Sequence, residues 1–240
     1  MDWSRILVTV PAYDEAESLP RVIPEIRAAA PGAPILVVDD CSADDTREVA
    51  RRLGVTVASH PVNLGAGAAV GTGFLYALGR GFDLAVNVDG DGQHDPRYLG
   101  DVAGPVARGE ADVAIGSRYV ARTSYRAPVL RRAGMVVFSL LTTWLAGCSI
   151  RDTTSGYRAY SREVMRHCVR DLPHDFPDAP FLIHLARSGF RIVEVPVEMR
   201  AREHGRSFYT LGKSLYYPYK NLLASIFVAL RVKRQGRKSS

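Results

Sequence analysis

Two aspartates, Asp89 and Asp91, stand two residues apart with Gly90 between them. They follow the apolar run 84–88, which predicts a buried strand, so both carboxylates would project from the end of that strand. Two carboxylates at this spacing can hold one hard divalent cation, Mg²⁺ or Mn²⁺, whose remaining positions stay open to the oxygens of a diphosphate. Gln93 can add an oxygen ligand or a hydrogen bond. The alternative is a polar turn, because Asp and Gly are common turn residues.

A second acidic pair, Asp39 and Asp40, follows the apolar run 35–38. One carboxylate there can accept both hydroxyls of a ribose or an N–H of a base. The alternative is that Asp40 or Ser42 caps the helix that follows, where an acid also favours the positive end of the helix dipole. Both interpretations hold together if one acid binds and the other caps.

The glycine-rich turn Asn63-Leu64-Gly65-Ala66-Gly67 opens a predicted helix, and its backbone N–H groups can contact a phosphate or a ribose. The alternative is a plain loop. The chain contains no G-x-x-x-x-G-K-[ST] phosphate loop, and no G-x-G-x-x-G opens its first helix. Neither an ATPase nor a dinucleotide enzyme is therefore indicated.

The elements that must position these residues alternate along the chain. Strand-like runs are predicted at 6–10, 35–38, 55–58, 84–88, 113–115 and 191–195, and helices at 19–30, 44–53, 66–80 and 96–108. Ser18 and Ser42 stand where helix N-caps are expected. This alternation predicts an α/β nucleotide-binding architecture, with a mostly parallel central sheet and helices on both faces.

Length and composition agree with one folded domain. The chain has 240 residues, of which 47% are hydrophobic and 23% charged, which excludes a disordered or fibrous protein. A net charge of +6 suits a polyanionic partner but does not identify it. Three cysteines, without a CxxC pair, fit a reducing cytoplasm, and we expect a cytoplasmic protein without an export signal.

Seven motifs in chain order resemble glycosyltransferase family 2, and within it the polyprenyl-phosphate sugar synthases similar to dolichol-phosphate mannose and glucose synthases. The motifs are Val10–Leu19, Val38–Thr46, Asn63–Gly65, Asp89–Pro96, Gly116–Tyr119, Asp152–Arg158 and Arg202–Ser207. The resemblance spans about Ile6 to Leu230. It implies a GT-A type fold and an inverting displacement at the anomeric carbon of a UDP- or GDP-sugar.

The resemblance also implies roles for single residues. Pro11, Tyr13, Glu15 and Asp39 would hold the nucleoside, and Asp89, Asp91 and Gln93 would serve the metal and the diphosphate. Phosphates of donor or acceptor would lie near Ser117, Arg118, Arg131, Arg202 and Ser207. The planar guanidinium fork matches phosphate oxygens, which supports the arginines physically. For Arg131 the alternative is a solvated basic face.

The acceptor decides whether the reaction needs a general base. A polyprenyl phosphate is already ionised at pH 7, whereas a sugar or nucleoside hydroxyl needs a carboxylate to take its proton. Asp152 and Asp178 are the candidates for that carboxylate. If the acceptor is a lipid phosphate, we expect Asp152 to organise the loop that ends in Arg158 instead.

The C-terminal part bears on the same choice. Residues 1–208 are expected to form the catalytic domain, and residues 209–240 an amphipathic helix with a basic tail. Such a helix suits peripheral contact with an anionic membrane; the alternative is packing on the core or at a homodimer interface. The longest apolar stretches, 136–145 and 222–230, are shorter than the ~20 residues that span a bilayer.

Three hypotheses follow. The first is sugar transfer to polyprenyl phosphate, and the second is the same chemistry on a soluble hydroxyl acceptor. The third, a non-enzymatic nucleotide or nucleic-acid binder, is disfavoured, because Asp39, Asp89 and Asp91 would repel a polyphosphate unless a metal intervened. We expect no nucleic-acid partner.

Overall fold

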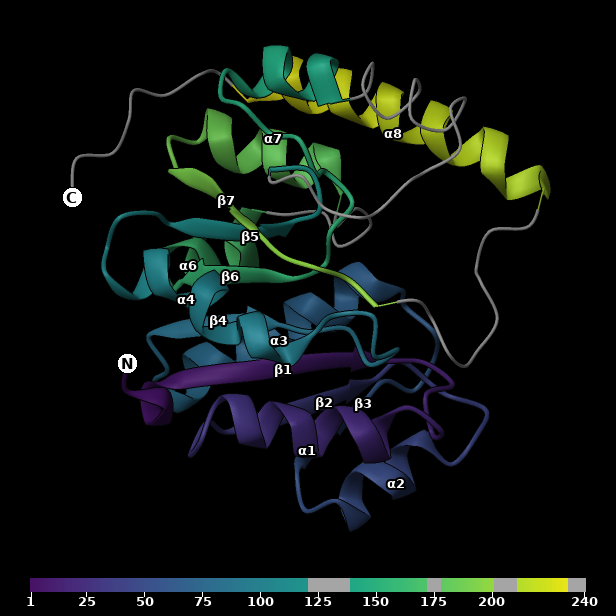
Figure 1. The fold of residues 1–240 in the computed structure, drawn as a ribbon. Helices are drawn as coiled ribbons and strands as arrows, with labels where there is room; N and C mark the ends of the chain where they lie inside the picture. Colours follow the sequence, from purple (N-terminus) through teal and green to yellow (C-terminus); the bar gives the residue numbers. More distant parts are fainter. Residues whose placement is uncertain (121–138, 172–177, 201–210, 233–240) are drawn as a thin grey trace.

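The computed structural model describes residues 1–120, 139–171, 178–200 and 211–232, and for 211–219 it describes the backbone alone (Figure 1). In this part of the chain one seven-stranded sheet has the order β3-β2-β1-β4-β6-β5-β7. Its strands are β1 (Ile6–Ala12), β2 (Ile35–Asp39), β3 (Thr56–Ser59), β4 (Leu84–Asn87), β5 (Val113–Ser117), β6 (Arg158–Ser161) and β7 (Ile192–Pro196). All neighbours pair in parallel except those of β6, which is antiparallel to both β4 and β5. The predicted mostly parallel sheet is confirmed.

Helices cover both faces of the sheet. They are α1 (Leu19–Ala29), α2 (Thr46–Arg52), α3 (Ala66–Arg80), α4 (Leu99–Ala107), α6 (Arg162–Asp171), α7 (Ala179–Arg187) and α8 (Leu211–Arg231), with helical residues also at 139–146 and 3₁₀ turns η1 (Trp3–Arg5) and η2 (Pro96–Tyr98). Side chains alternate along each strand, so Val8 and Val10 face the core under α1 and α4, whereas Leu7 faces the core under α3 and α6. The two faces therefore have separate hydrophobic cores.

One strand and two helices were not predicted from the sequence. β6 reads Arg-Ala-Tyr-Ser and lacks an apolar run, yet its first three residues are buried, Arg158 among them. Half of the residues of α6 are charged, and it buries only Val164, Met165 and Cys168. The apolar residues of α7 directly follow a proline-rich stretch, which hides their helical periodicity. These elements escape detection because polar or short segments carry a weak periodic signal.

The prediction that Ser42 caps the second helix is wrong. α2 begins at Thr46, and Asp45 occupies its N-cap position. The Ser42 hydroxyl instead accepts the Asp14 backbone N–H at 3.0 Å. Ser18 does stand at the N-cap of α1, but its side chain makes no capping hydrogen bond and contacts the Gly90 carbonyl at 2.6 Å. Both serines therefore connect loops at the carboxyl ends of the strands.

The C-terminal helix α8 packs on α7 (Figure 1). Its two sides differ in exposure. Ser225 and Ala229 face inward and are buried, whereas Phe227 and Leu230 are 67% and 76% exposed. Arg187 of α7 donates to the Val232 carbonyl at 2.7 Å and to the Leu145 carbonyl at 3.1 Å, which links α8 to the helix at 139–146. Among the described helices, none has both the length and the apolar character needed to cross a bilayer.

Candidate active site

The site residues gather at one edge of the sheet. The parallel strands β1, β2, β4 and β5 all end there, and the antiparallel β6 begins there, since Arg158 pairs with both Asn87 and Ile115. In open α/β sheets, ligands bind outside the carboxyl ends of the parallel strands. The topology thus brings Asp39, Asp89, Arg118 and the loop 152–156 to the same edge, although they are far apart in the chain.

Asp89 lies against the loop that precedes β6. The Asn87 side-chain amide donates to the Gly156 carbonyl at 3.0 Å, which fixes that loop beside β4. A Cβ atom placed on Gly156 would lie 2.7 and 2.8 Å from the two carboxylate oxygens of Asp89. Only glycine leaves room for the Asp89 carboxylate in this position.

His94 binds the backbone of Asp89. Its Nδ1 accepts the Asp89 backbone N–H at 3.0 Å, so Nε2 carries the proton of the neutral ring, and Nε2 lies 3.5 Å from Asp89 Oδ2. The ring stacks on Tyr157, with the centroids 4.9 Å apart. Burial lowers the pKa of His94 to about 4 despite the nearby carboxylate of Asp91. At neutral pH an uncharged histidine therefore holds the Asp89 backbone.

The next residues of the loop are held by the Asp91 side chain and by the segment that follows β7. Asp91 Oδ1 accepts the Gln93 N–H at 3.0 Å, and the Gln93 carbonyl accepts the Arg200 N–H at 2.8 Å. The described residues contain no group of three or more His, Cys, Asp and Glu side chains placed to hold a metal ion. Asp89 and Asp91 fit a divalent cation that takes its other ligands from phosphate and water, because both are hard oxygen ligands and the Asp89 side chain is 41% exposed.

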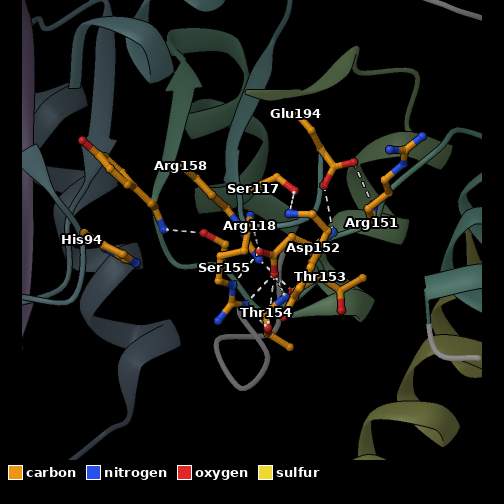
Figure 2. Close-up of polar contacts among 12 residues, drawn as sticks. His94, Ser117, Arg118, Arg151, Asp152, Thr153, Thr154, Ser155, Arg158 and Glu194 are labelled. Carbon is orange, nitrogen blue, oxygen red and sulfur yellow. Dashed lines mark hydrogen bonds and ion pairs between the residues drawn. The ribbon is translucent and has the colours of Figure 1, made fainter. Parts of the chain in front are cut away.

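Arg118 and Asp152 form the best-connected ion pair of the site (Figure 2). Asp152 accepts hydrogen bonds from Arg118 N at 3.0 Å, Nε at 2.8 Å and Nη2 at 2.7 Å. Arg118 Nη2 also donates to the Thr154 hydroxyl at 2.6 Å. Burial of Asp152 opposes its ionisation, but the hydrogen bonds and charge of Arg118 keep the pKa of this carboxyl below its ordinary value. Asp152 is therefore a charged anchor for Arg118.

The neighbours of this pair complete the edge of the site. Ser117 is fully buried, and its hydroxyl accepts the Tyr119 N–H at 3.3 Å. Behind the pair, Glu194 of β7 accepts the backbone N–H groups of Arg151 and Asp152 (Figure 2). The fully buried Arg158 donates to the Thr153 carbonyl at 3.0 Å. The loop 151–156 is thus fixed from both sides.

The two acids after β2 differ in their contacts. Asp39 Oδ1 accepts the Ser42 N–H at 3.1 Å, and within the described part of the chain no hydrogen bond reaches its Oδ2. Asp40 contacts His60 Nδ1 at 2.7 Å and accepts the N–H groups of Leu64 at 2.9 Å and Gly65 at 2.7 Å. Asp39 is therefore a buried carboxylate whose Oδ2 has no hydrogen bond from the described residues, whereas Asp40 secures the turn before α3.

The other predicted donor residues lie in the loops beside these acids. Pro11 is in β1, and Glu15 is buried, with its Oε2 2.7 Å from the Ser18 hydroxyl. Tyr13 is half-buried in the loop after β1, and Asn63 is exposed in the turn before α3. These residues lie in β1 and in the loops that follow β1 and β3, and their contacts with the nucleoside stay predictions.

Four further predicted residues remain. Arg131, Arg202 and Ser207 lie outside the described residues. Asp178 occupies the N-cap position of α7, on a separate element from the Arg118–Asp152 pair. The predicted roles of these residues stay predictions.

Three functional residues had no role assigned from the sequence. His94 and Gly156 stand inside motifs whose neighbours attract attention, and Glu194 lies within a short strand. A polar residue inside an apolar strand is the signal that points to Glu194, whereas the stacking of His94 on Tyr157 and the contact of Gly156 with Asp89 depend on the three-dimensional approach of β4 to β6. Sequence spacing cannot show that approach.

Comparison with known proteins agrees with this geometry. A family model described as glycosyl transferase family 2 matches residues 7–169. A polyprenol monophosphomannose synthase of Mycolicibacterium smegmatis is 39% identical over 217 residues, covering 85% of this chain and 80% of the relative. An undecaprenyl-phosphate mannosyltransferase of Micrococcus luteus is 35% identical over 213 residues, covering 85% and 86%.

Solved structures show the same fold. A glucosyl-3-phosphoglycerate synthase from Mycobacterium tuberculosis, crystallised with Mn²⁺, uridine diphosphate and phosphoglyceric acid, superimposes with a TM-score of 0.69. The two sequences are 23% identical, and the match covers 98% of this chain and 80% of that one. At this identity the similarity establishes the arrangement of strands and helices.

Proposed function

The chain belongs to glycosyl transferase family 2, and from that premise we propose that it transfers a sugar from a UDP- or GDP-sugar to a polyprenyl phosphate. Its fold is of the GT-A type, and it is a glycosyltransferase. We propose the donor, the acceptor and the roles of the individual residues. We also propose that residues 1–208 form a catalytic domain and residues 209–240 a C-terminal segment.

The contacts of Asp152 are the observation that favours a phosphate acceptor over a hydroxyl acceptor. A hydroxyl acceptor needs a carboxylate that takes a proton, and a useful base has a pKa near the working pH. Asp152 is buried, receives three hydrogen bonds from Arg118 and has a lowered pKa, so it is a poor base. A lipid phosphate is already a nucleophile and benefits from the cation that Asp152 holds.

On the donor side, Asp39 would accept the ribose hydroxyls or a base N–H, with Pro11, Tyr13 and Glu15 around the nucleoside. Asp89 and Asp91, with Gln93 beside them, would hold a divalent cation. When bound, Mg²⁺ or Mn²⁺ neutralises the charge that develops on the departing diphosphate. His94 and Gly156 keep the Asp89 carboxylate at its place beside β4.

On the acceptor side, Arg118 would bind the acceptor phosphate. This phosphate would attack the anomeric carbon on the side opposite to the departing diphosphate. Ser117 lies next to it in β5, and we propose that Arg131, Arg202 and Ser207 add contacts to the same phosphate or to the diphosphate. The names of the relatives from Mycolicibacterium smegmatis and Micrococcus luteus, which specify polyprenol and undecaprenyl phosphate, support a polyprenyl acceptor.

We further propose peripheral membrane contact through α8. Its outer side exposes Leu223, Ile226, Phe227 and Leu230, and the sequence continues with Arg231, Lys233 and Arg234. Apolar side chains beside basic ones favour an anionic bilayer. Sedimentation with vesicles that contain phosphatidylglycerol tests this: Phe227→Ser should reduce binding, whereas Leu75→Ser, at an exposed position of α3, should not.

Incubation with labelled UDP- and GDP-sugars, Mn²⁺ and polyprenyl phosphate tests the proposed reaction. Formation of a labelled lipid that organic solvent extracts supports it. Transfer only to soluble hydroxyl compounds would favour the alternative acceptor, with Asp178 as the remaining candidate base. If no labelled lipid forms with any of these donors, the proposed donor or acceptor is wrong.

A further inference from the structure

Glu194 holds the backbone of the loop that carries Asp152. Its Oε1 accepts the Asp152 N–H at 2.8 Å, and its Oε2 accepts the Arg151 N–H at 2.9 Å (Figure 2). Both oxygens of one carboxylate thus bind two successive N–H groups of a loop more than forty residues earlier in the chain. Hydrogen bonds to an ionised acceptor are about twice as strong as neutral ones.

Asp152, which Glu194 holds in this way, binds the Arg118 side chain. Asp152 takes its backbone position from Glu194 and offers its carboxylate to Arg118, which donates from N, Nε and Nη2. Arg118 follows β5, and Glu194 lies in the adjacent strand β7, where it pairs with Ile115. Glu194 in β7 therefore holds the backbone of Asp152, and Arg118, directly after β5, holds its side chain.

A contact of similar type joins the same strands at their other end. Asp112, just before β5, accepts the Arg191 backbone N–H at 2.7 Å and the Arg191 Nε at 3.1 Å. This pair ties β5 to β7 where both strands begin, at the edge opposite the site. Asp112 therefore supplies a matched control, because its loss weakens the junction of the two strands without touching the loop 151–156.

We propose that Glu194 is a positioning residue for sugar transfer, which fixes Arg118 through Asp152. The inference rests on the proposed function in one respect, the contact of Arg118 with a substrate phosphate. Glu194 itself would touch neither donor nor acceptor. Its loss should leave the sheet folded but allow the loop 151–156, and with it the Arg118 guanidinium, to leave the position shown in Figure 2.

Glu194→Gln is the informative substitution. Glutamine keeps one oxygen that can accept an N–H, but its amide nitrogen would face the other N–H of the loop as a second donor. We expect the KM for polyprenyl phosphate to rise about tenfold, which corresponds to the loss of one hydrogen bond to a charged group. Asp112→Asn should leave this KM unchanged, even if both variants lower Tm equally.

A double-mutant cycle separates positioning from general weakening. If Glu194 acts through Arg118, Glu194→Gln should cost little further activity once Arg118→Lys has removed the guanidinium fork. Independent, multiplicative losses in the double variant would overturn the inference. So would a Glu194→Gln variant with the same KM as Asp112→Asn.

Nuclear magnetic resonance gives a readout that does not depend on activity. The Arg118 Nε–H signal, identified by its absence in Arg118→Lys, should be protected from solvent exchange and should lose that protection in Glu194→Gln. Unchanged protection would overturn the positioning role. If instead the protection is lost but Arg118→Lys transfers sugar normally, Glu194 still positions Arg118, and the proposed phosphate contact of Arg118 is what fails.

Discussion

Gly156 approaches Asp89 so closely that a Cβ atom on Gly156 would lie 2.7 Å from a carboxylate oxygen of Asp89. We therefore expect Gly156→Ala to displace the Asp89 carboxylate and to weaken metal binding tenfold or more, by about the amount typical for changes around metal ligands. The Mn²⁺ concentration that gives half-maximal transfer measures this effect.

Gly79→Ala in α3 is the control for that substitution, because a Cβ atom there meets no atom within 4 Å. It should keep the normal Mn²⁺ dependence and stabilise the helix by about 0.5–1 kcal/mol. An equal Mn²⁺ dependence in Gly156→Ala and Gly79→Ala would show that Asp89 is not a metal ligand.

Arg118→Lys should lower kcat/KM for polyprenyl phosphate by about tenfold to a hundredfold. Lysine keeps the charge but cannot make the forked contact with Asp152 and Thr154 that sets the direction of the guanidinium. Steady-state kinetics with varied polyprenyl phosphate measures the change. Arg97→Lys, which removes a similar contact with Asp95 from a side chain that is 77% exposed, should be neutral.

Asp39 and Asp40 should respond differently to the same substitution. Asp39→Asn should weaken nucleotide binding about tenfold with little change in stability, since it removes a charged acceptor from the pocket. Asp40→Asn should lower the free energy of unfolding by about 1–3 kcal/mol, because the N–H groups of Leu64 and Gly65 lose their charged acceptor. Calorimetric titration with UDP and GDP and urea unfolding distinguish the two outcomes; identical profiles would refute the division of roles.

His184 of α7 should make stability depend on pH. Its Nε2 lies 2.8 Å from His167 Nε2, and burial, with a smaller contribution from the charge of His167, lowers the pKa of His184 to about 4. The unfolded chain, with a histidine pKa near 6.5, then binds more protons than the folded one. Stability is complete above pH 6.5 and is lost as the pH falls from 6.5 towards 4.

Urea unfolding at several pH values tests the role of His184. His184→Gln should flatten the decline in unfolding free energy between pH 6.5 and about 4, relative to the unchanged protein. His94 also titrates in this range and keeps its own contribution in both proteins, so the difference between them isolates His184 and its partner. Parallel curves would show that His184 does not titrate in this way.

The sequence predicts the parallel half of the fold and the principal acids of the site, because apolar runs followed by polar residues reveal strands and their carboxyl ends. It does not reveal β6, whose buried Arg158 has no apolar signature. The approach of Gly156 to Asp89 and the support of Asp152 by Glu194 follow from the pairing of β6 and β7 with their neighbours. Contacts across strands that are distant in sequence depend on that pairing.

The same strand pairing bears on which of its two predicted roles Asp152 has. From the sequence it is a candidate base or an organiser of its loop. In the structure its carboxylate is buried and bonded to Arg118, which favours the organising role. Asp178, at the N-cap of α7, keeps its predicted role only if the acceptor is a hydroxyl compound.

The most direct test of sugar transfer to a lipid phosphate is a labelled-donor assay in which polyprenyl phosphate and a mixture of soluble sugars are offered together. We expect the label from a UDP- or GDP-sugar to enter the organic phase only when polyprenyl phosphate and Mn²⁺ or Mg²⁺ are present. Chelation of the metal and Arg118→Lys should each reduce that label strongly. Label that enters only water-soluble products, with every donor, would contradict the proposed acceptor.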